Sequence, residues 1–367
     1  MVRRVRESVA AIAVAVVSVM VALAISMLLI AIAGESPMAA VRAMFSASFG
    51  GVSQIGGMLR KLVPLTLVSL GWVVAFSVRR INVGLEGQIL AGGTLATLVG
   101  LHVAGMPAVI HIAAVSFVGA IGSLALAGVA AWLWARRNVN EIISTLLLNF
   151  VMIQIVSWLV NGPLEEPTHT LGQTGPISPS ARWPMIEALR TRWDILLVPI
   201  GVAVIYVLLT RTRLGFRMRA TGSNNRFAAY SGLRTVRVSV LAMIISGGLA
   251  GLAGASLISS NPAGNMGENF SANFGFEGIA VALLARNHPI GCLPAAVLFA
   301  VLRQGGSLME AQAGISSGLV LVTQGLVIGI VAASNFYVSR YRRRRIDATG
   351  QATRRTAAVP AREAIES

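Results

Sequence analysis

The stretch GQILAGGTLATLVGLHVAGMPAVIHIAAVSFVGAIGSLALAGVAAWLWA, residues 87–135, contains 49 residues and no Asp, Glu, Lys or Arg. One helical crossing of a membrane needs about 20 apolar residues, because the hydrocarbon layer is about 30 Å thick and a helix rises about 1.5 Å per residue. The stretch is therefore long enough for two crossings, with Gly105 and Pro107 at the hairpin between them. It predicts an integral membrane protein.

The composition of the whole chain agrees with this prediction. Of its 367 residues, 55% are hydrophobic and 12% are charged, and the mean hydropathy is +0.74. A soluble domain carries about 25% charged residues. The net charge of +16 would suggest nucleic acid as a partner of a soluble protein, but aromatic residues are not interleaved with the basic clusters. We therefore expect a lipid bilayer as the partner of this chain, and no nucleic acid. The chain has a single cysteine, Cys292, which cannot form an intrachain disulfide.

Apolar windows between charges and Gly/Pro breaks predict an all-α, polytopic helical bundle with about ten spans. The predicted spans are 9–33, 58–78, 83–103, 107–134, 142–160, 194–210, 236–259, 273–285, 289–302 and 316–338. The eighth and ninth are short for a full crossing, so the alternative is a re-entrant pair around residues 286–289. The first follows three arginines, as a signal peptide does, but its apolar stretch is longer than usual and favours a retained helix.

The distribution of positive charge predicts the orientation. With the N-terminus in the cytoplasm, 23 Lys and Arg residues lie inside and 7 outside, as the positive-inside rule requires. Both termini are then cytoplasmic. Residues 1–338 are expected to form the membrane domain, and residues 339–367 a basic, disordered tail.

Two long connections are predicted outside the bilayer. Residues 161–193 contain five prolines and are expected to form an extracytoplasmic cap, because proline resists helix formation. Residues 211–237 carry seven arginines and are expected in the cytoplasm. There Ser223 or Asn224 is suited to cap a short helix over 225–230, which Gly232 would end. Such a surface helix is typical of a docking element for a soluble partner.

Four segments of the chain carry a family resemblance. They are INVGLEGQILAGG (81–93), NEIISTLLLNF followed by NGPLEEP (140–150 and 161–167), LGFRMRATGSNNRFAAYSGL (214–233) and GFEGIAVALLARNHPIG (275–291). The chain thereby resembles the membrane permease subunits of bacterial ABC importers for nucleosides and simple sugars, relatives of the ribose and branched-chain amino-acid permeases. With the spacing between the segments, the resemblance covers nearly all of residues 58–338.

This resemblance implies a non-catalytic transport subunit in the bacterial inner membrane. Its implied partners are a cytoplasmic ABC ATPase, a second permease subunit and an extracytoplasmic substrate-binding lipoprotein. The residues agree that ATP is hydrolysed elsewhere, because a P-loop ends in Lys-Ser/Thr, whereas the only lysine, Lys61, is followed by Leu62. The similar loop in the family engages the ATPase, which implies a coupling role for Gly215, Arg217, Arg219, Gly222, Asn224, Ala228, Ala229, Tyr230 and Gly232.

Polar residues inside the predicted spans are candidates for the substrate pathway, because an unpaired polar group in hydrocarbon costs several kcal/mol. They are Asn82, Glu86, Gln88, Asn149, Gln154, Asn273, Glu277, Thr323 and Gln324. Amide side chains both donate and accept hydrogen bonds, which suits a neutral, hydroxyl-rich solute. Asn82 and Glu86 are four residues apart and are expected to share a helix face.

Each of these residues also has a structural interpretation. Glu86 is either a gate contact or a helix-capping carboxylate that pairs with Arg79, Arg80 and helix-start amides. Asn149 and Gln154 either line the pathway or form interhelical hydrogen bonds. No metal or catalytic cluster is apparent in the sequence, and no cofactor is expected.

Two alternative functions remain open at this point. The first is a permease for branched-chain amino acids or another small solute. The second is a membrane channel or enzyme without an ATPase. The second permease subunit is either another copy of this chain or a related chain, and the nucleoside-type motifs favour a related chain.

Overall fold

The computed structural model describes residues 36–169 and 171–313, together with residues 17, 20, 21, 24–32 and 34 and residues 322, 325, 326, 329 and 330. The chain forms two compact units, one of residues 1–34 with 321–367 and one of residues 35–320. All elements named below belong to the second unit. The predicted spans 9–33 and 316–338, the basic tail and the pathway candidates Thr323 and Gln324 fall mostly or wholly outside the described residues.

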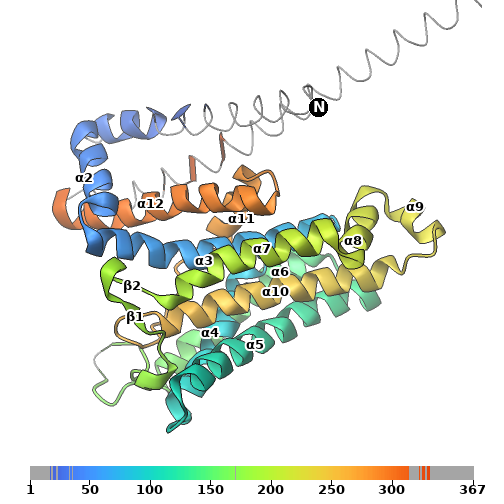
Figure 1. Ribbon diagram of the computed structural model, residues 1–367, viewed down its shortest axis with the longest axis horizontal. Helices are drawn as coiled ribbons and strands as arrows, with labels where there is room; N and C mark the ends of the chain where they lie inside the picture. The colour runs from blue at the N-terminus through green and yellow to red at the C-terminus, as the bar shows by residue number, and fades with distance from the viewer. Residues whose placement is uncertain are drawn as a thin grey trace, which may run out of the picture. The chain divides into compact units, whose positions relative to one another are not determined.

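The second unit is a helical bundle with one small hairpin (Figure 1). Its α-helices are α2 (Pro37–Phe49), α3 (Val52–Ser77), α4 (Leu85–His102), α5 (Ala108–Arg137), α6 (Glu141–Val160), α7 (Leu197–Arg211), α8 (Arg213–Ser223), α9 (Asn225–Tyr230), α10 (Thr235–Ser259), α11 (Phe274–Leu284) and α12 (Pro289–Ala313). The connection between α6 and α7 holds the 3₁₀ turns η1 (Pro179–Ala181), η2 (Glu187–Leu189) and η3 (Trp193–Leu196) and the antiparallel strands β1 (Met185–Ile186) and β2 (Thr191–Arg192).

The prediction of a mostly helical fold with several apolar helices is confirmed. Six described segments are long and apolar enough to cross a membrane: α3, α5, α6, α10, Trp193–Arg211 with α7, and Pro289–Gly306 in α12. The total of about ten spans stays a prediction. The predicted eighth span is a short helix, α11, as expected. The predicted end of the ninth span, at residue 302, was wrong. Helix α12 continues past Arg303 to Ala313, because the Arg303 charge is neutralised within the bundle by Glu277 at 2.6 Å.

Helix α4 lies at the centre of the unit and packs against α5, α6, α10 and α11. Thirteen of its eighteen residues are buried, so it contacts protein rather than lipid along most of its length. The crossing with α10 is close because glycine faces glycine: a Cβ on Gly92 would lie 2.5 Å from the Cα of Gly251. Small residues at such crossings let two backbones approach in lipid, where hydrophobic burial does not drive association.

We expect Gly92→Ala to destabilise the protein by about 1–3 kcal/mol, because the added methyl meets backbone atoms that cannot rotate away. Thermal unfolding of the detergent-solubilised protein measures the change. Gly128→Ala in α5 is the matched control, since a Cβ there has nothing within 4 Å and alanine is favourable in a helix. Equal unfolding temperatures for the two variants would contradict the close crossing.

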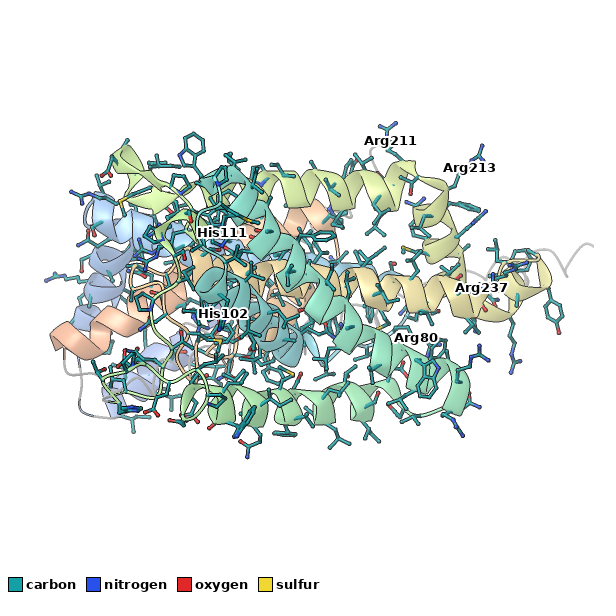
Figure 2. The ribbon with its side chains drawn as sticks, turned by 90° about the horizontal axis from the view of Figure 1, so that it is seen from below. Arg80, His102, His111, Arg211, Arg213 and Arg237 are labelled. Carbon is teal, nitrogen blue, oxygen red and sulfur yellow. The ribbon has the colours of Figure 1, made fainter. Side chains whose placement is uncertain are left out.

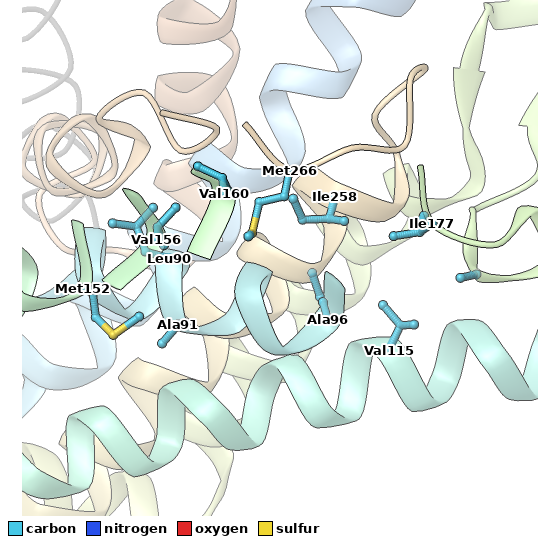
Figure 3. Packing of buried hydrophobic residues seen from close by; sticks show 12 residues of the cluster. Leu90, Ala91, Ala96, Val115, Met152, Val156, Val160, Ile177, Ile258 and Met266 are labelled. Atoms are coloured by element: carbon cyan, nitrogen blue, oxygen red, sulfur yellow. The ribbon is translucent and has the colours of Figure 1, made fainter. Parts of the chain in front are cut away.

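The connection between α6 and α7 packs against the helices, and its predicted extracytoplasmic location stays a prediction. Ile177 and Ala181 are buried in one hydrophobic cluster with residues of α4, α5, α6 and α10 (Figure 3). Beside it, His111 at the start of α5 lies 2.9 Å from the Ser180 hydroxyl, and His102 ends α4. The two histidines thus flank the hairpin at residues 105–107.

Candidate functional site

An irregular segment follows α10 and runs back into the bundle beside α4. Met266 lies at Thr97, with 3.5 Å between sulfur and hydroxyl, and Asn273 reaches Glu86. These contacts are eleven residues apart on α4, or about 16 Å at the rise of a helix. Residues 266–273 therefore run along α4 for that length without forming a helix, with one edge of the segment buried and the other exposed. Non-helical backbone is tolerated at membrane depth only where protein or a water-filled cavity covers it.

The Glu86 carboxylate binds the N-terminus of α11 at the inner end of this segment. Its two oxygens accept hydrogen bonds from the backbone N–H groups of Asn273, at 3.1 Å, and Gly275, at 2.6 Å. Glu86 is 4% exposed. A negative charge is favourable there because the first N–H groups of a helix are unpaired and its dipole is positive at that end. Of the two interpretations of Glu86, this geometry matches the capping carboxylate, although Arg80 pairs with Glu141 at 3.1 Å instead.

A buried ion pair joins α11 to α12. Arg303 donates to Glu277 at 2.6 Å and to the carbonyl of Ala272 at 2.6 Å. Its guanidinium also lies 3.7 Å from the ring centre of Phe274. Lys61 of α3 donates to the Arg303 carbonyl at 3.2 Å. Arg303 of α12 therefore holds the start of α11 in place, and Lys61 of α3 binds α12 at the same point.

A second polar cluster lies where α4 begins. The Asn82 side chain donates to Gln88 and to Ser246 of α10, both at 2.9 Å. Asn149 of α6 accepts from the Gly87 N–H at 2.8 Å and donates to the Val83 carbonyl at 2.9 Å. The expected shared face of Asn82 and Glu86 is wrong, because α4 begins only at Leu85 and Asn82 lies in the turn before it.

The remaining candidates lie on the outside of the unit. Gln154 is exposed on α6, in a shallow groove of about 470 Å³ between Phe150 and Trp158. One turn further along α6, Ser157 donates to Glu268 of the irregular segment. Glu268, Asn269 and Asn273 are exposed on that segment. We call Gln154, Ser157, Glu268, Asn269 and Asn273 the polar stripe.

The polar stripe divides the predicted pathway residues into two groups. Gln154 and Asn273 belong to it, whereas the others that the structure describes are buried and bonded to protein: Asn82, Glu86, Gln88, Asn149 and Glu277. Sequence reasoning missed Ser157, Glu268 and Asn269. The one available signal was the carboxylate of Glu268, five residues before the predicted span 273–285.

Helices α8 and α9 lie at the end of the unit where arginines gather. Figure 2 shows Arg80, Arg211, Arg213 and Arg237 at this end, away from His102 and His111. The predicted helix over 225–230 is confirmed as α9, and the Asn224 side chain caps it by accepting from the Phe227 N–H at 3.0 Å. Gly232, just beyond α9, has a φ of +81°, which favours glycine.

The other predicted coupling residues divide into an exposed and a packed set. Arg217, Arg219, Ala229 and Tyr230 are exposed, and Gly215 and Ala228 are buried. Gly222 packs against the backbone of Ser77, where α3 ends, so closely that a Cβ would overlap the Ser77 carbonyl. Helix α8 therefore contacts α3 directly. Helix α9 is thus connected, through α8 and the end of α3, with the turn that contains Asn82.

The chain is similar to known transport proteins. Residues 54–333 match the family described as the permease component of branched-chain amino acid transport systems. The chain is 32% identical to the glucose ABC transporter permease protein TsgB13 of Haloferax volcanii, over 86% of this chain and 87% of the relative. It is 30% identical to the guanosine ABC transporter permease protein NupP of Bacillus subtilis (84% and 89%) and 29% identical to the nucleoside ABC transporter permease protein NupB of Lactococcus lactis (82% and 84%). No solved structure is significantly similar to it.

Proposed function

Because this chain belongs to the family of permease components of branched-chain amino acid transport systems, we propose that it is the membrane subunit of an ABC importer for nucleosides or simple sugars. ATP is hydrolysed on a separate ATPase subunit. A second permease subunit and an extracytoplasmic binding lipoprotein complete the complex. Both termini face the cytoplasm, as the arginine clusters within residues 3–6 and 340–345 support.

The polar stripe is the observation that supports the proposed substrate class. Four of its polar side chains are exposed and Ser157 is half-buried, next to helices whose outward residues are large and apolar, such as Phe150 and Trp158. In lipid these groups would be costly, so they face water or a second subunit. Three amides and a hydroxyl offer donors and acceptors to sugar hydroxyls, and only Glu268 is ionisable. We propose that the stripe forms one wall of the translocation path.

In this proposal the buried pathway candidates do not contact the solute. They affect the translocation path indirectly, by positioning α11. Glu86 and Glu277 fix the start of α11, and Asn82 and Asn149 fix the turn before α4. ATP-driven movement of α9 would reach this turn through α8 and the end of α3. The start of α11, beside Asn273, is the part of the wall that we propose to move.

Uptake assays test the substrate class. Cells that express the complete importer should accumulate labelled guanosine or glucose, and unlabelled leucine should not compete. Gln154→Leu with Asn273→Leu should reduce uptake at least about tenfold, because buried solute hydroxyls would lose their partners. Ile143→Leu, on an exposed apolar face of α6, is the control. Competition by leucine would favour the amino-acid alternative, and full uptake by the double variant would remove the stripe from the path.

A further inference from the structure

A basic groove lies between α5 and α10, at the end of the unit where the arginines gather. Its volume is about 740 Å³, and it is lined by Trp132, Ala135, Arg136, Arg234, Thr235, Val236, Arg237, Val240, Leu241 and Ile244. Nearer the middle of the unit, α5 and α10 are in close contact through small residues, with Gly247 against Ala127. Toward Arg237 the facing side chains are larger, and the seam between the helices opens into the groove.

The two ends of the groove differ in chemistry. Arg136, Arg234 and Arg237 are exposed at one end. Among the described residues, none of the three guanidinium groups has a hydrogen bond or a carboxylate partner, and no acidic residue lines the groove. The other end is apolar, where Leu241 is 39% exposed and the Trp132 indole 52% exposed.

We propose that this groove binds an anionic phospholipid from the cytoplasmic leaflet. The phosphate would lie among the three arginines, which carry positive charge with no internal partner. The acyl chains would lie along Val240, Leu241 and Ile244, in line with the hydrocarbon. Trp132 would stand at the headgroup level, where tryptophans are enriched. Basic pockets between membrane helices on the cytoplasmic side are suited to such headgroups.

Charge complementarity favours an anionic lipid over a zwitterionic lipid or a protein as the occupant of the groove. Each arginine near the surface enriches an anionic lipid about fivefold. A zwitterionic headgroup adds an ammonium group, which the three guanidinium groups would repel. A protein partner would have to bury the apolar end as well, although that end is continuous with the hydrocarbon-facing surfaces of α5 and α10.

Quenching of Trp132 by brominated lipids tests the proposal. The full-length chain, with the subunits that copurify with it, is placed in nanodiscs of phosphatidylcholine and phosphatidylglycerol, with bromine on the acyl chains of either one or the other. The chain has six tryptophans, so the Trp132 signal is the difference from Trp132→Phe. Half-maximal quenching should need at least about fivefold less brominated phosphatidylglycerol than brominated phosphatidylcholine.

Two charge-matched variants identify the site. Arg136→Gln/Arg234→Gln/Arg237→Gln should abolish the preference for phosphatidylglycerol. Arg343→Gln/Arg344→Gln/Arg345→Gln, with the same loss of charge in the tail, should retain it. The proposal is overturned if both lipids quench equally or if the two triple variants behave alike. It is also overturned if neither lipid quenches Trp132, because a protein would then cover the groove.

Discussion

Phe227→Ala with Tyr230→Ala should abolish ATP-driven uptake while leaving the protein folded in the membrane. Both rings project from α9, where Phe227 is 70% and Tyr230 is 91% exposed. Two large aromatic side chains left uncovered beside Arg226 are typical of the centre of a protein interface. Loss of one such anchor costs at least about 2 kcal/mol, or a thirtyfold weaker association.

Copurification of the ATPase with the tagged chain, alongside uptake, measures this effect. Phe117→Ala, on an exposed face of α5 (67% exposed), removes a similar ring far from α9 and should change neither quantity. Charge reversal at Arg217 or Arg219, or deletion of residues 223–232, should also separate uptake from ATP hydrolysis. An aromatic double variant that keeps its ATPase and its uptake would show that α9 is not the docking element.

Arg303→Met should be the most destabilising single substitution within the bundle. It would leave the Glu277 carboxylate, whose side chain is 7% exposed, without its counter-ion, and the Ala272 carbonyl without its donor. Breaking a buried ion pair by removing one partner costs about 3–5 kcal/mol. The unfolding temperature in detergent should fall accordingly, and the yield of folded protein should fall with it.

A double variant separates the ion pair from simple packing. Arg303→Met with Glu277→Gln removes both charges and should recover most of the stability, because no isolated charge stays buried. Arg137→Met, at the exposed end of α5, is the control and should have little effect. If the double variant were as unstable as Arg303→Met alone, the side-chain volume of arginine rather than its charge would be the stabilising feature.

The sequence predicted those parts of the fold that depend on local signals. Uncharged runs located α3, α5, α6 and α10, and the cap-and-glycine pattern located α9 within one residue. Arginine clusters predicted a cytoplasmic side, and in the structure Arg80, Arg211, Arg213 and Arg237 lie at one end of the unit.

The parts that sequence reasoning missed depend on partners distant in the chain. The length of α12 depends on Arg303, whose neutralising partner Glu277 is 26 residues away. For Glu86 the sequence left both a gate contact and a capping carboxylate open, because the N–H groups that it binds lie nearly 190 residues later, at the start of α11. The irregular segment before α11 contains no long apolar run, so a window of hydropathy cannot distinguish it from a surface loop. Only its contacts along α4 reveal that it enters the bundle.

The central claim is that this chain moves a neutral, hydroxyl-rich solute only when a separate ATPase drives it. Proteoliposomes that contain this chain, its second permease subunit, the ATPase and the binding protein measure this directly, with labelled guanosine or glucose. We predict ATP-dependent accumulation that disappears when the ATPase is omitted or when Phe227 and Tyr230 are replaced by alanine. Accumulation that persists without the ATPase would contradict the claim and favour a channel.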